Sequence, residues 1–230
     1  MKKPLLFLLA VLLLAWPVLA EDGQEPAGYI ALTFDDGPSG PITERLLDGL
    51  RDRDAHATFF LCGYRMDQYP APLSRYVSEG HELGVHSWDH VDQTRLSVDD
   101  LHRDVKQTAQ KIFTVTGVRP TLLRPPGGAW NENVKREAAG ESLSILLWSV
   151  DPRDWATRDA DAVLTAMAAS VGDGDVVLLH DMSDSSVDAA LRLIDRLSAQ
   201  GYRFVTVTEL AAIRGVSLAP GEVYRALPGK

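Results

Sequence analysis

The amino-acid sequence predicts a single α/β domain, folded either as a barrel or as an open doubly wound sheet. Its 230 residues are 24% charged and 45% hydrophobic, which is ordinary for a globular protein that buries one sizeable core. Between residues 29 and 214, short apolar runs alternate about seven times with amphipathic stretches, a pattern typical of strand–helix units. No repeat, linker or low-complexity tract divides this span, so one domain covering residues 29–214 is predicted.

Seven short runs rich in Val, Ile, Leu and Phe are predicted to form buried parallel strands, and amphipathic helices are predicted between them. The runs are residues 29–34, 57–61, 82–85, 121–124, 145–150, 176–179 and 203–207. Ser97 followed by Asp100 resembles a capping box that opens a helix reaching about residue 115. A later helix ends at Gly201, and its apolar face consists of Val187, Ala190, Leu191, Ile194 and Leu197.

Residues 1–20 have the features of a secretory signal peptide. A basic head at residues 1–3 precedes an apolar run at residues 5–16, and small residues follow at Val18 and Ala20. The alternative is a membrane anchor, but this 12-residue run is shorter than the roughly 20 residues that a span needs. We therefore expect cleavage after Ala20, no stable membrane anchor, and a periplasmic or secreted protein. Residues 21–28 and 215–230 are expected to be loosely held tails.

The charge of the chain excludes one class of partner. The formal net charge is −9, and no run of Lys or Arg offers a stripe for phosphate groups. Nucleic acid is therefore not an expected partner, and the overall field does not attract the protein to an anionic surface. A neutral sugar polymer remains compatible with this charge. Because Cys62 is the single cysteine, no internal disulfide is expected.

Polar residues follow five of the predicted strands. They lie in residues 33–38, 86–90, 124–128, 151–155 and 178–181. Taken singly, these segments are compatible with turns, a solvated helix face, a helix cap or a core histidine. Because loops after the carboxyl ends of parallel strands converge on one face, the five together predict a single active site.

The residue types in these segments suit metal-assisted hydrolysis of an acyl group. His86, His90 and one of Asp35 and Asp36 form a three-ligand set of the kind that zinc hydrolases use. The other aspartate is then free to act as a base on water, and His180 suits a general acid. Arg124 can hold the base carboxylate through a charge-assisted hydrogen bond, while Asp154 can orient His180 or pair with Arg124.

Residues 33–38, 86–90, 124–127, 151–155 and 178–180 resemble, in order and spacing, the five motifs of the polysaccharide deacetylases. This family is carbohydrate esterase family 4, the NodB-homology domain, and the resemblance extends over residues 29–214. It implies a distorted (β/α) barrel of about seven parallel strands. It also implies hydrolysis of N-acetyl groups on β-1,4-linked amino sugars of the peptidoglycan or chitin type.

The resemblance further implies a role for each motif residue. Asp35 would be the general base, tethered by Arg124, and His180 the general acid, assisted by Asp154. The metal, usually zinc although another divalent ion such as Co²⁺ serves some members, would be bound by Asp36, His86 and His90. Trp155 and Leu178 would line the acetyl pocket.

Gly127 departs from the family pattern, which commonly has a larger side chain at this position. The glycine keeps the backbone N–H that would stabilise the oxyanion, but removes a wall of the substrate groove. Trp130 either replaces that wall as a stacking platform for sugar or belongs to the core.

Two other functions remain open at this stage. One is an O-acetyl esterase acting on xylan or another acetylated polysaccharide. The other is an inactive carbohydrate-binding domain, against which the complete set of base, ligands and acid argues. In each case an acetylated polysaccharide is the expected partner, and a monomer is expected.

Overall fold

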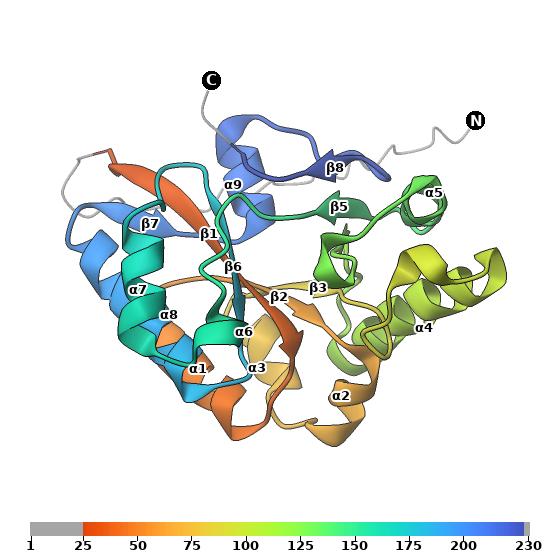
Figure 1. The fold of residues 1–230 in the computed structure, drawn as a ribbon, viewed down its shortest axis with the longest axis horizontal. Coiled ribbons are helices and arrows are strands. Elements are labelled where there is room, and N and C mark those ends of the chain that lie inside the picture. The colour runs from red at the N-terminus through yellow and green to blue at the C-terminus, as the bar shows by residue number, and fades with distance from the viewer. Residues whose placement is uncertain (1–24, 228–230) are drawn as a thin grey trace, which may run out of the picture.

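The computed structural model describes residues 25–227, which form a parallel α/β sheet; the predicted signal peptide lies outside these residues. The described strands run in the order β6-β1-β2-β3-β4-β5-β8. Strand β7 pairs with the amino-terminal part of β1, and β6 pairs with the part that follows it. All paired strands are parallel (Figure 1). Beyond β5, Val150 forms a parallel bridge to Val177 of β6, which brings the sheet back on itself. The predicted distorted barrel of parallel strands is confirmed.

All seven predicted strands are present, and β8 is an additional one. The strands are β1 (Gly28–Gly37), β2 (Thr58–Leu61), β3 (Glu82–Val85), β4 (Leu122–Leu123), β5 (Ser144–Leu146), β6 (Val176–His180), β7 (Tyr202–Phe204) and β8 (Val223–Tyr224). The prediction of a loose C-terminal tail is wrong for the part that contains β8, which pairs with β5, and for Leu227, which is buried. This segment covers the edge of β5 that would otherwise leave backbone groups unpaired.

The helices surround the sheet. They are α1 (Pro41–Arg51), α2 (Gly63–Gln68), α3 (Leu73–Ser78), α4 (Val98–Thr116), α5 (Glu132–Gly140), α6 (Asp154–Thr157), α7 (Ala160–Ala168), α8 (Asp184–Ser198) and α9 (Val207–Arg214), with 3₁₀ turns η1 (Gln93–Arg95) and η2 (Pro126–Gly128). Helix α8 packs against α1 and α7 on one flank, and α4 packs against α5 on the other (Figure 1).

The predicted helix boundaries are close to the observed ones. The side chain of Ser97 accepts a hydrogen bond from the backbone N–H of Asp100, so it caps α4, which ends at Thr116. Helix α8 ends at Ser198, three residues before the predicted Gly201. Gly201 instead takes a left-handed conformation, with φ of 87°, in the turn that leads into β7.

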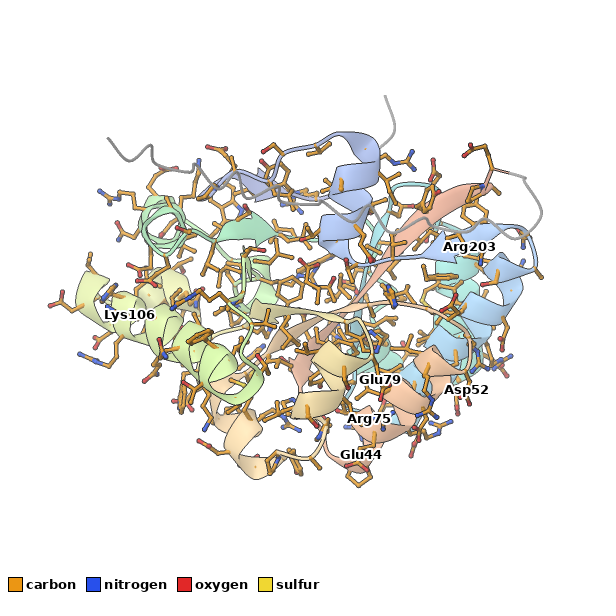
Figure 2. All side chains as sticks on the ribbon, turned by 180° about the vertical axis from the view of Figure 1, so that it is seen from behind. Glu44, Asp52, Arg75, Glu79, Lys106 and Arg203 are labelled. Atoms are coloured by element: carbon orange, nitrogen blue, oxygen red, sulfur yellow. The ribbon has the colours of Figure 1, made fainter. Side chains whose placement is uncertain are left out.

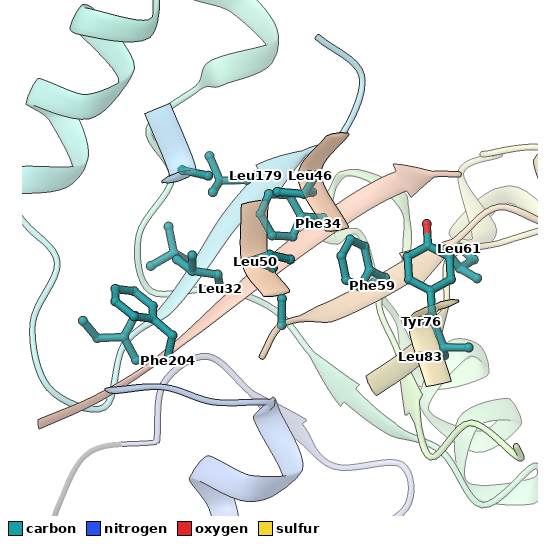
Figure 3. Packing of buried hydrophobic residues seen from close by; sticks show 14 of the residues in the cluster. Leu32, Phe34, Leu46, Leu50, Phe59, Leu61, Tyr76, Leu83, Leu179 and Phe204 are labelled. Atoms are coloured by element: carbon teal, nitrogen blue, oxygen red, sulfur yellow. The ribbon is translucent and has the colours of Figure 1, made fainter. Parts of the chain in front are cut away.

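Aromatic rings fill the core between β1, β2 and the helices outside them (Figure 3). Phe34 stacks on Phe59 with ring centroids 5.3 Å apart, and Tyr76 of α3 lies 4.5 Å from the Phe59 ring. Leu46 and Leu50 of α1 close the same cluster, and all five side chains are fully buried. Each of the four leucine and phenylalanine side chains contributes about 1.5–3 kcal/mol through burial. This packing fixes the carboxyl end of β1, where the candidate site begins.

Charged side chains extend from the outer surfaces of the helices (Figure 2). Arg75 of α3 contacts Glu79, which caps the carboxyl end of that helix, at 2.5 Å and Asp48 of α1 at 2.9 Å. Arg75 and Glu79 are partly buried and Asp48 is exposed. Ion pairs at a protein surface contribute about 0–1 kcal/mol each, so the core dominates stability. Within residues 25–227, no helix combines the length and apolar character that crossing a membrane requires.

Candidate active site

The structure brings the polar segments together at the carboxyl ends of the strands. Asp35 and Asp36 lie near the end of β1, and His180 is the last residue of β6. Because β1 and β6 are parallel neighbours, Asp35 and His180 are directly paired in register. His86 follows β3 and Arg124 follows β4, so side chains far apart in the sequence share one face.

Asp36, His86 and His90 form a group whose side-chain atoms fit a divalent metal ion. Oδ1 of Asp36 lies 3.4 Å from Nε2 of His86 and 3.3 Å from Nε2 of His90. Residues 25–227 provide no hydrogen-bond partner for this buried oxygen. Burial raises the pKa of Asp36, but the adjacent imidazoles outweigh it and lower the pKa to about 2. An ionised, unpartnered oxygen between two imidazole nitrogens is the donor set of a zinc-type site.

The backbone around these residues holds them in unusual conformations. Nδ1 of His86 lies 2.6 Å from the carbonyl oxygen of Arg124, which it can donate to, leaving Nε2 for a ligand. Asp36, Ser87 and His90 have positive φ angles of 70°, 67° and 55°. Each such conformation costs of the order of 1–3 kcal/mol and persists only where surrounding contacts impose it.

Asp104 of α4 makes hydrogen bonds that hold the backbone between His86 and His90 in these conformations. Sequence analysis missed this residue. It is 6% exposed. It accepts hydrogen bonds from Ser87 Oγ at 3.0 Å, the Trp88 backbone N–H at 2.8 Å and Gln93 Nε2 at 2.8 Å. These bonds fix the loop between the two histidines. The available signal was an aspartate on the core-facing side of an amphipathic helix, between Leu101 and Thr108.

Arg124 holds the Asp35 carboxylate from the buried side of the candidate site. Its fully buried guanidinium donates to Asp35 Oδ1 at 2.7 Å and to Thr33 Oγ1 at 2.7 Å. Nε and Nη2 donate to the carbonyl oxygens of Leu146 and Leu147 at 3.0 and 2.8 Å. The buried charge pair is therefore well hydrogen-bonded, the condition under which such a pair is tolerated. Asp35 is fixed in one orientation.

Asp154 contacts His180, which settles the choice between His180 and Arg124 as its partner. Oδ1 of Asp154 lies 2.8 Å from His180 Nδ1, and Oδ2 accepts the His180 backbone N–H at 2.9 Å. Burial lowers the pKa of His180, but the hydrogen bond and the charge of Asp154 outweigh it and raise the pKa to about 9. His180 is therefore a protonated donor at neutral pH.

Removing the charge of Asp154 is expected to lower the pKa of His180. In the wild type, NMR titration should show His180 losing its proton near pH 9; in Asp154→Asn the midpoint should move toward the ordinary histidine value of about 6.5. Asp151→Asn is the matched control, because Asp151 accepts from the Arg153 backbone in the same loop. An equal shift in both variants, or none in Asp154→Asn, would contradict this assignment.

The four residues expected to contact substrate differ in exposure. Leu178 is buried, whereas Trp155 is 57% exposed and Trp130 is 39% exposed, so Trp130 belongs to the surface rather than the core. Gly127 has a φ of 62°, and a Cβ added there would meet no described atom within 4 Å. The conformation therefore favours glycine although the space is open. Gly127, Trp130 and Trp155 are therefore accessible to a substrate from solvent.

Sequence analysis included Asp181 in the polar segment after the sixth predicted strand but gave it no role. It is fully buried behind His180, and one carboxylate oxygen accepts a hydrogen bond from Thr43. The other oxygen has no partner in the described part of the chain. A Cβ at Gly37 would lie 2.8 Å from both oxygens, which explains the glycine after the two aspartates. Burial raises the pKa of Asp181 to about 7.

Asp181 is expected to make stability depend on pH. Its folded pKa of about 7 exceeds the value of 3.8 taken for the unfolded group, so the folded state binds this proton more tightly. The contribution of Asp181 to the free energy of unfolding should therefore fall as the pH rises from about 4 to about 7. Asp181→Asn should gain stability relative to wild type by a few kcal/mol across that window. Urea unfolding at a series of pH values measures the free energy of unfolding, and Asp184→Asn, at an exposed position, is the control. If the free energies of wild type and Asp181→Asn changed in parallel with pH, the prediction would be contradicted.

Comparisons with known proteins agree with this geometry. A family model described as polysaccharide deacetylase matches residues 22–143. Peptidoglycan-N-acetylmuramic acid deacetylase PdaC of Bacillus subtilis is 41% identical over 185 residues, which are 80% of this chain and 39% of PdaC. Peptidoglycan-N-acetylglucosamine deacetylase PgdA of Listeria monocytogenes is 41% identical over 195 residues, 85% of this chain and 41% of PgdA. The chain thus spans about two fifths of the length of these two relatives.

Solved structures show the same fold. The structure of PdaC from Bacillus subtilis has a TM-score of 0.79 and 40% identity, covering 82% of this chain and 92% of that chain. A family 4 acetyl xylan esterase from Clostridium thermocellum, in complex with a cobalt ion, has a TM-score of 0.81 and 32% identity. That match covers 87% of this chain and 99% of the esterase.

Proposed function

Because this chain belongs to the polysaccharide deacetylase family, we propose that it is a metal-dependent N-deacetylase acting on β-1,4-linked amino sugars. The substrate would be an acetylated polymer of the peptidoglycan or chitin type, and the products acetate and a free amino sugar. One observation carries the proposal: the Arg124–Asp35 and Asp154–His180 pairs flank the metal-binding group in a single site. An inactive binding domain has no need of all three.

The metal would be held by Asp36, His86 and His90. The unpartnered oxygen of Asp36 between two imidazole nitrogens supports this assignment, and Zn²⁺ or another divalent ion such as Co²⁺ suits the donors. A divalent ion bound there would lower the pKa of a coordinated water and polarise the acetamide carbonyl.

The protein residues would move the protons. Asp35, fixed by Arg124, would accept a proton from the attacking water. His180, fixed and kept protonated by Asp154, would donate a proton to the departing amine as the carbon–nitrogen bond breaks. The backbone N–H of Gly127 would donate to the oxyanion, and Leu178 with Trp155 would contact the acetyl methyl. Trp130 would offer an aromatic face to a neighbouring sugar.

The second candidate is an O-acetyl esterase, favoured by the similarity to an acetyl xylan esterase. Acetate release from purified peptidoglycan, chitooligosaccharide and acetyl-xylan separates the two functions. We expect release from an amino-sugar polymer and little from acetyl-xylan. Preference for acetyl-xylan would support the esterase instead. Failure to release acetate from any polymer, with metal bound, would support a binding domain.

We further propose that the protein is exported and acts as a monomer outside the cytoplasm, without a membrane anchor. Exported material should begin at Glu21, because the basic head and short apolar run end in Val18 and Ala20. Amino-terminal sequencing of this material is the test. A protein that still begins with Met1 would contradict cleavage and support an anchor.

A further inference from the structure

A second group of metal-ligand side chains lies between α4 and α5, which pack against each other (Figure 1). His102 extends from α4, Glu137 from α5, and Glu141 caps the carboxyl end of α5. Nδ1 of His102 lies 2.9 Å from Glu137 Oε1 and 4.0 Å from Glu141 Oε1. The side chain of Glu137 is only 13% exposed, while that of His102 is 48% exposed. The group is thus partly enclosed and open to solvent on one side.

The two glutamates stand in an electrostatically unfavourable place. They are four residues apart at the end of one helix, where like charges repel. They also lie at the carboxyl end of α5, where the helix dipole disfavours negative charge, and the last turn of this helix contains no basic residue. Within residues 25–227, His102 is the one basic side chain that either carboxylate contacts within 4.0 Å. Two carboxylates therefore converge on a single imidazole.

We propose that His102, Glu137 and Glu141 bind a second Zn²⁺ ion, separate from the active-site metal. Two ligands about 2.1 Å from a tetrahedral ion lie about 3.4 Å apart, so the observed separations of 2.9 and 4.0 Å need only small side-chain rotations. A nitrogen ligand beside two carboxylates favours Zn²⁺ over Mg²⁺ or Ca²⁺, which prefer oxygen alone. Binding displaces the proton of Nδ1 into solvent. The double positive charge neutralises both glutamates.

An ion bound here would link α4 and α5, the two helices that contact the loops of the candidate active site. Asp104, two residues beyond His102 on α4, holds the loop between His86 and His90. Helix α5 begins just after the η2 turn that contains Gly127, and its capping residue Asn131 donates to the carbonyl oxygen of Thr94 at 3.3 Å. An ion joining α4 to α5 would therefore stiffen the contact between the segment after His86 and the segment that runs from Gly127 to Asn131.

Zinc stoichiometry tests the proposal. After equilibrium dialysis at neutral pH and mass-spectrometric metal analysis, we expect two equivalents of Zn²⁺ in the wild type and one in His102→Ala. His86→Ala, which removes an active-site ligand, should also retain one. Glu132→Gln is the matched control, because Glu132 lies at the opposite end of α5, and it should keep two. Two equivalents in His102→Ala, or a single equivalent in the wild type that His102→Ala retains, would overturn the proposal.

Thermal unfolding gives a readout that does not depend on catalysis. Added Zn²⁺ should raise the unfolding temperature of His86→Ala but not of His86→Ala combined with His102→Ala. If the second variant does not fold, Glu137→Gln combined with Glu141→Gln replaces His102→Ala. Equal zinc-dependent shifts with and without the group would contradict a site there. A single wild-type equivalent that disappears in His102→Ala would support this site while contradicting the proposed active-site metal.

Discussion

Replacing His180 by alanine is expected to lower kcat for the proposed deacetylation by about 10²–10⁴, while the fold and the proposed active-site metal remain. The reason is positional. The Asp154 carboxylate orients His180 and keeps it protonated. His180 does not belong to the candidate metal group, which consists of Asp36, His86 and His90. A departing amine without this donor must leave with its proton supplied by water.

Metal analysis and acetate release, measured on the same preparation, decide the role of His180. Because His180→Ala leaves the buried Asp154 carboxylate without its side-chain partner, His180→Gln should be measured beside it to retain a hydrogen-bond donor. His56→Ala is the control, since His56 contacts Glu209 in another part of the molecule, and it should keep full activity. Zinc content that falls in step with activity in both His180 variants would make His180 a ligand instead of an acid.

The fold was predictable where the sequence signal is local. Apolar runs bounded by polar residues identified seven strands, because a buried parallel strand is apolar on both faces. The strand at Val223–Tyr224 had no such signal, since two residues cannot show a period and its half-buried side chains are stabilised by pairing with β5. The carboxyl end of α8 illustrates the same limit. Its apolar face was evident, but its last residue depends on packing that sequence does not display.

The candidate site was predictable from the strand ends, but its internal contacts were not. Convergence of five loops follows from parallel topology, so the grouping of two histidines with one of the paired aspartates could be anticipated. The choice of Asp36 rather than Asp35 rested on the resemblance to the family. The partner of Asp154 could not, because both His180 and Arg124 offer a cation and only the three-dimensional path of the chain selects one. Asp104 bonds the loop between His86 and His90, whereas Asp181 bonds Thr43, and the burial of both aspartates is visible only in the folded protein.

The two adjacent aspartates are expected to fail in different ways when they are replaced. Asp36 Oδ1 lies 3.4 and 3.3 Å from the imidazole nitrogens of His86 and His90, so Asp36→Ala would remove one of the three proposed metal ligands. Zinc affinity should fall strongly, and activity should partly return at high metal concentration. Asp35 Oδ1 is instead held at 2.7 Å by Arg124. Asp35→Asn keeps the size and one acceptor but cannot take a proton from water.

Zinc should therefore remain bound in Asp35→Asn while turnover is lost by at least about 10²-fold, and added metal should not restore it. Loss of the carboxylate charge beside the fully buried Arg124 costs up to about 3–5 kcal/mol of stability, so both variants must be compared well below their unfolding temperatures. Glu82→Gln provides a control, because it neutralises a partly buried acid that bonds Thr58 and Thr208 at the start of β3, whereas His86 follows the end of that strand. Zinc loss in Asp35→Asn together with zinc retention in Asp36→Ala would reverse the two assignments, making Asp35 the ligand and Asp36 the base.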